Sequence, residues 1–91
     1  MRVGAYIIVK GMVQGVGYRW FASKQAGLYG LKGWVRNLPN GSVELEIEGE
    51  QEIIREFIKQ LKAGPSYSRV SDVTVQWKEF QDKFTSFDIS Y

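Results

Sequence analysis

The sequence contains no histidine and no cysteine. Without cysteine, the chain has no disulfide bond, no thiolate nucleophile and no cysteine-based metal site. Without histidine, it lacks the commonest general acid or base and the commonest metal ligand. An enzyme of this composition works without imidazole or thiol, which favours reactions whose leaving group needs no proton.

Long apolar runs and an excess of one charge are also missing. No stretch approaches the ~20 apolar residues of a membrane span, and the apolar run near the N-terminus is too short for a signal peptide. Twelve basic and 10 acidic residues are scattered, with no patch that would favour nucleic acid. We therefore expect a soluble, cytoplasmic monomer with no nucleic-acid or membrane partner.

The length of 91 residues predicts a single domain over residues 1–91. Hydrophobic periodicity predicts strands at residues 5–11, 31–37, 42–48, 73–77 and 87–91, and helices at residues 19–29 and 50–63. Asn40 and Gly41 form a strong hairpin signal between the second and third strands. This order predicts a ferredoxin-like α+β sandwich, with an antiparallel sheet of four to five strands and two helices on one face.

The same periodicity predicts which side chains are buried. In the third strand, three apolar residues alternate with Glu44, Glu46 and Glu48, which predicts one buried face and one solvated face rather than a metal site. The buried stripe of the second helix is predicted to comprise Ile53, Ile54, Phe57, Ile58 and Leu61. The buried face of the first helix is predicted to comprise Phe21, Ala22, Ala26 and either Leu28 or Tyr29.

The connection between the first strand and the first helix has the character of an anion-binding loop. Gly15 and Gly17 allow the backbone to turn successive N–H groups inward, and the following helix adds its positive end. Arg19 supplies a planar fork of donors suited to phosphate. The plainer interpretation is that the glycines only shape the connection and that Arg19 is solvated. Neither a Walker A loop nor a dinucleotide fingerprint fits, because no Lys-Ser/Thr follows and Trp20 is too bulky.

A carboxamide, Asn37, ends the second predicted strand. It is suited to holding a water molecule, although an ordinary turn residue before the hairpin is the plainer interpretation. We expect Arg36 to be solvated and Trp34 to pack.

Two motifs together resemble the acylphosphatase family. The first is matched at Gly11, Val13, Gln14, Gly15, Val16, Tyr18 and Arg19. The second is matched at Gly33, Trp34, Val35, Asn37, Gly41, Val43 and Glu44. The resemblance covers nearly the whole chain.

This resemblance implies a hydrolase that cleaves small acyl phosphates into a carboxylate and inorganic phosphate, without cofactor or metal. It implies that the phosphate-binding loop comprises Gln14, Gly15, Val16, Gly17, Tyr18 and Arg19, and that Arg19 and Asn37 form the catalytic pair. A carboxylate leaving group is already stable as an anion, so no general acid is required and the missing histidine is no handicap.

Other interpretations remain open at this stage. The chain could be a non-catalytic phospholigand-binding module, or its sheet could bind single-stranded RNA. It could also be one domain of a larger maturation enzyme, although a chain that starts at Met1 is expected to be complete.

Overall fold

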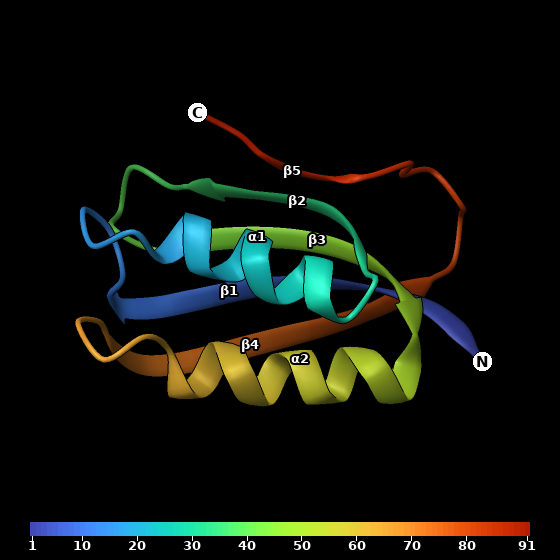
Figure 1. The fold of residues 1–91 in the computed structure, drawn as a ribbon, viewed down its shortest axis with the longest axis horizontal. Coiled ribbons are helices and arrows are strands. Elements are labelled where there is room, and N and C mark those ends of the chain that lie inside the picture. The colour runs from blue at the N-terminus through green and yellow to red at the C-terminus, as the bar shows by residue number, and fades with distance from the viewer.

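The computed structural model describes residues 1–91 and shows a two-layer α+β sandwich (Figure 1). The strands are β1 (Arg2–Met12), β2 (Lys32–Asn37), β3 (Val43–Glu50), β4 (Arg69–Glu79) and β5 (Phe87–Ile89), and the helices are α1 (Tyr18–Leu28) and α2 (Gln51–Ala63). The sheet has the order β4-β1-β3-β2-β5, and both helices lie on one of its faces (Figure 1). The predicted ferredoxin-like fold is confirmed.

The sheet differs from the prediction in one strand direction. β1, β2, β3 and β4 pair antiparallel as expected, but β5 pairs parallel with β2, so the sheet is mixed. The reason is topological. β4 ends at the same end of the sheet at which β2 begins, so a chain that crosses to the far edge there must run back in the direction of β2 (Figure 1).

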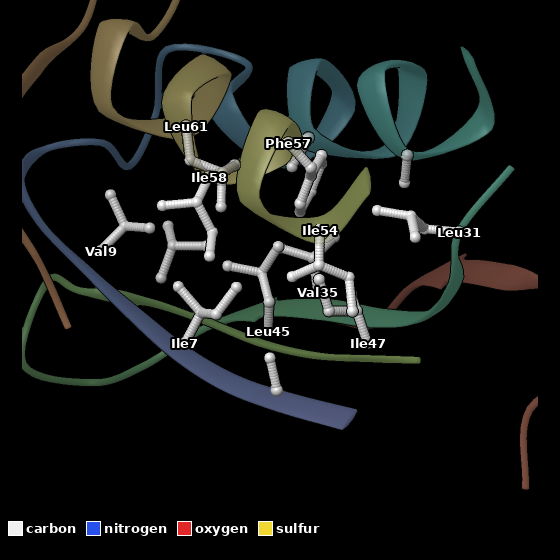
Figure 2. Packing of buried hydrophobic residues seen from close by; sticks show 14 of the residues in the cluster. Ile7, Val9, Leu31, Val35, Leu45, Ile47, Ile54, Phe57, Ile58 and Leu61 are labelled. Carbon is white, nitrogen blue, oxygen red and sulfur yellow. The ribbon is translucent and has the colours of Figure 1, made fainter. Parts of the chain in front are cut away.

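The hydrophobic core lies between the sheet and the two helices (Figure 2). The sheet contributes alternate residues of its three central strands, which include Ile7, Val9, Val35, Leu45 and Ile47. The α2 side of the core is formed by Ile54, Phe57, Ile58 and Leu61. The predicted stripe of α2 is therefore confirmed except for Ile53, which is 37% exposed because it lies one residue outside the i, i+3, i+4, i+7 face.

The end of α1 resolves the choice between its two candidate core residues. Leu28 is 73% exposed, whereas Tyr29 is partly buried and packs edge-on against Phe57, with ring centroids 6.5 Å apart. Ala22 and Ala26 are fully buried, so small side chains bring α1 close to the sheet.

The glutamate face of β3 is not solvated, which corrects the prediction. Glu44 and Glu48 are only 7% and 5% exposed. Glu48 accepts hydrogen bonds from the N–H groups of Gln81 and Lys83, at 2.6 and 3.0 Å, because the connection from β4 to β5 folds over this end of the sheet. Alternation identifies the residues that share a face, but not the segment that covers it.

Partners on neighbouring strands and on the same connection neutralise the other two carboxylates. Glu44 accepts from the Tyr6 hydroxyl and, at 2.5 Å, from Nε of the largely exposed Arg36. The bond from Tyr6 to this carboxylate raises the pKa of the Tyr6 hydroxyl. Partial burial favours the neutral form of Glu46, but Lys83 and Lys78 outweigh it and hold the pKa of that carboxyl below its usual range.

Candidate active site

A shallow pocket of about 250 Å³ lies where the end of β1, the start of α1 and the end of β2 meet. In Figure 1 this is the end of the sheet beside the first turn of α1. Its lining residues are Val13, Gly15, Gly17, Tyr18, Arg19, Trp20, Asn37, Ile89 and Tyr91. Arg19 and Asn37, which are far apart in the sequence, are thereby brought to one concavity that no aspartate or glutamate lines.

The loop before α1, which lines this pocket, carries a row of free backbone donors. Gly15 and Gly17 have φ angles of 73° and 75°, in the left-handed region that favours glycine. The first hydrogen bond of α1 runs from Phe21 N–H to Gly17 O, and no side chain caps the helix. The N–H groups from Gln14 to Trp20 therefore donate to no backbone carbonyl, which is the arrangement of an anion-binding nest at a helix N-terminus.

Buried anchors hold this loop in place. Tyr18 is almost completely buried, and its hydroxyl donates to Leu61 O of α2 at 2.7 Å. Burial raises the pKa of the Tyr18 hydroxyl, so it remains a neutral donor. Gln14 Nε2 donates to both Leu38 O and Ser42 O, at 2.7 and 2.8 Å. The Gln14 side chain therefore joins the loop to the β2–β3 turn, directly beyond Asn37.

Replacing Gln14 with alanine is expected to lower the free energy of unfolding by about 1–2 kcal/mol, because two hydrogen bonds are lost while both carbonyls keep a backbone partner. We also expect kcat for the hydrolysis that the sequence resemblance implies to fall about tenfold, since the loop and Asn37 lose their shared anchor. Gln14→Glu is expected to be worse, because a carboxylate faces two carbonyls. Urea denaturation and steady-state kinetics test this, with the exposed Gln76→Ala on β4 as control. A wild-type kcat in both Gln14 variants would show that the hydrogen bonds of Gln14 do not position the loop and Asn37 for activity.

Arg19 lies in the first turn of α1 and is held from the C-terminal segment. Its Nη1 donates to Ser90 O at 3.0 Å, and its guanidinium carbon lies 4.5 Å from the centre of the Tyr91 ring. Ser90 is itself fixed by a bond from its N–H to Val35 O at 2.8 Å. One edge of the guanidinium is thus restrained, while its remaining N–H groups are free to bind an anion in the pocket.

Asn37 is the last residue of β2, and strand alternation sets its direction. It pairs with the buried Val43 and shares the helix-covered face, whereas Arg36 faces the opposite side and pairs with Glu44. Asn37 Oδ1 is buried and accepts no hydrogen bond from the protein. A buried acceptor without a partner is costly, so the position of this oxygen is not explained by a stabilising hydrogen bond within the fold.

A second pocket, of about 160 Å³, lies at the opposite end of the sheet. Its charged lining residues are Glu48, Glu50 and Asp82 together with Arg2 and Lys32, so carboxylates outnumber cations and disfavour a phosphoryl group. We therefore place the candidate site at the Arg19 pocket.

Most of the predicted site residues line this pocket, but two do not. Four of the predicted loop residues, Gly15, Gly17, Tyr18 and Arg19, line the pocket together with Asn37. Gln14 and Val16 do not line it, because Gln14 binds the β2–β3 turn and Val16 packs partly buried against the core. Of the other four lining residues, Val13 belongs to the first family motif, whereas no sequence pattern assigned Trp20, Ile89 or Tyr91 to the site. The position of Trp20 directly after Arg19 was an available signal, whereas the approach of β5 and Tyr91 depends on tertiary structure.

Two further observations concern metal binding and membrane crossing. No group of three or more aspartate, glutamate, histidine or cysteine side chains is arranged to hold a metal ion. Neither helix has the length and apolar character that crossing a membrane requires.

Comparison with known proteins gives a consistent result. The family model described as acylphosphatase matches residues 5–89. An acylphosphatase of Bacillus licheniformis is 45% identical over 85 residues, which cover 93% of this chain and 94% of that protein. An acylphosphatase of Geotalea uraniireducens is 43% identical over the full length of both chains. The crystal structure of acylphosphatase from Bacillus subtilis superposes with a TM-score of 0.94 at 36% identity, covering 98% of this chain and 99% of that one.

Proposed function

The chain belongs to the acylphosphatase family and hydrolyses acyl phosphates, and we propose that Arg19, Asn37 and the loop from Gln14 to Arg19 carry out this reaction. One observation supports the proposal above the others. The residues that line a single pocket come from a loop with unpaired N–H groups, and they include an arginine and an asparagine whose buried amide oxygen has no partner.

The phosphoryl group occupies the loop side of the pocket. Its oxygens accept from the free N–H groups at the start of α1 and from Arg19, which together neutralise the charge that these oxygens carry in the transition state. The helix N-terminus adds a favourable field, and no carboxylate of the lining opposes it. Gln14 and Tyr18 act indirectly, because their side chains fix the loop rather than touch the substrate.

Asn37 holds the attacking water in line with the scissile bond. Its amide holds the water by a hydrogen bond, which leaves a lone pair of the water oxygen directed towards phosphorus. The water oxygen forms a bond to phosphorus, the bond from phosphorus to the acyl oxygen breaks, and the carboxylate leaves with the electron pair. The water proton passes to a phosphoryl oxygen of the substrate, since an amide cannot take it near pH 7. Histidine is not needed because the leaving carboxylate remains unprotonated.

Inhibition by product tests this site. Inorganic phosphate is expected to inhibit the hydrolysis of benzoyl phosphate competitively, and activity is expected to be unchanged by excess EDTA. Protection of the free enzyme against thermal unfolding by phosphate provides an independent measure of the same binding. Non-competitive inhibition without thermal protection, or loss of activity in EDTA, would contradict the proposed site.

We also propose that the enzyme is a cytoplasmic monomer that binds no nucleic acid, on the composition and charge described above. The non-catalytic alternative is not retained, since the family activity is that of a hydrolase.

A further inference from the structure

The side chains around the pocket differ sharply in exposure. Val13 and Tyr18 are each only 1% exposed and form the pocket floor. Trp20 and Tyr91 are 58% and 95% exposed and therefore stand at the rim. A substrate whose phosphoryl group lies against the loop must extend its acyl group outwards, past these rim residues.

The two rim aromatics are not equally available to an acyl group. The Tyr91 ring is engaged with Arg19, at 4.5 Å from the guanidinium carbon. The Trp20 indole has one charged neighbour, the Lys24 ammonium one turn further along α1, at 5.0 Å from the ring centroid. A cation on one face of an indole restrains its orientation and leaves the other face for a further contact.

We propose that Trp20 is the acyl-group contact of this enzyme and makes it prefer aromatic acyl phosphates over acetyl phosphate. The inference rests on the proposed function, because it requires the phosphoryl group to lie beside Arg19. An aromatic acyl group stacks on the indole, whereas an acetyl group is too small to reach it with comparable area. Trp20 is thus a specificity residue that acts on the leaving group and takes no part in the chemistry.

The test compares benzoyl phosphate with acetyl phosphate in wild type, Trp20→Ala and Trp20→Phe. For Trp20→Ala we expect kcat/KM for benzoyl phosphate to fall roughly three- to tenfold, the size of one aromatic contact, mainly through KM. We expect less than a twofold change for acetyl phosphate, and Trp20→Phe is expected to recover most of the loss. Leu28→Ala is the matched control, since Leu28 is an exposed apolar residue of the same helix that does not line the pocket.

Inorganic phosphate separates failure of this inference from failure of the proposed site. Its inhibition constant is expected to be unchanged in Trp20→Ala and to rise in Arg19→Ala. An equal loss of kcat/KM on both substrates, or no loss on either, would overturn the role of Trp20 and leave the phosphate site intact. Unchanged phosphate inhibition in Arg19→Ala would instead reject the proposed site itself.

Discussion

Replacing Asn37 with alanine is expected to lower kcat for benzoyl phosphate by about 10²–10³-fold, while the inhibition constant of inorganic phosphate changes by less than about threefold. The reason is that the proposed role of Asn37 is to orient the water, which leaves phosphoryl binding to the loop and Arg19. Asn37 lines the same pocket as Arg19, and its Oδ1 is buried at the end of β2 and receives no hydrogen bond from the protein. Steady-state kinetics with phosphate as a competitive inhibitor measure both quantities.

The stability of this variant distinguishes a catalytic role from a structural one. An unpartnered buried oxygen costs about 1–3 kcal/mol, so its removal is expected to leave the free energy of unfolding unchanged or slightly higher. Activity would then fall without any loss of fold. A structural turn residue would show the opposite, namely lower stability with nearly normal kcat.

Asn40 is the matched control for Asn37, because it is an asparagine of the following turn that does not line the pocket. Its Oδ1 accepts from Ser42 N–H at 3.0 Å, so Asn40→Ala is expected to cost about 1 kcal/mol of stability and to change kcat by less than about threefold. If Asn37→Ala retained most of the wild-type kcat, the water-positioning role would be wrong.

Local sequence pattern was sufficient for most of the fold. Alternation in β3 identified its core face, and helical spacing identified the α2 residues that pack on the sheet, because both depend only on side-chain direction. Gly15 and Gly17 were recognised as turn-forming residues, and both adopt the left-handed conformation that the loop requires. The motifs also placed Arg19 and Asn37 in one site, and the structure brings them to the same pocket.

Features that depend on long-range contacts were missed. The burial of Glu48 depends on the connection from β4 to β5, which is more than 30 residues away, and the parallel direction of β5 follows from that same crossing. Gln14 was assigned to the phosphate loop, but its side chain binds two carbonyls of the β2–β3 turn. No pattern within the loop specifies such a partner, since a glutamine donor is equally suited to a ligand or to backbone.

Replacing Arg19 with alanine is expected to lower kcat/KM for benzoyl phosphate by on the order of 10³-fold or more, the size associated with arginines that stabilise a transferring phosphoryl group. Unlike Asn37, Arg19 is proposed to contact the phosphoryl oxygens in the ground state as well, so KM and the phosphate inhibition constant are both expected to rise. Arg19→Lys is expected to recover only part of the loss, because an ammonium keeps the charge but not the planar fork of donors.

Arg36, which precedes Asn37 in the sequence, provides a control for the loss of one positive charge. It stands beside Asn37 in the sequence but on the opposite face of the sheet, paired with Glu44, so Arg36→Ala is expected to change kcat/KM by less than about threefold. Arg19 makes its protein contacts with Ser90 and Tyr91 near the surface, and their loss is expected to lower stability by no more than about 1 kcal/mol. A large loss of activity in Arg19→Ala, with stability nearly unchanged and Arg36→Ala active, requires direct action of Arg19 on the substrate. Equal losses in the two arginine variants would instead indicate a general effect of net charge, and the assignment of Arg19 would be wrong.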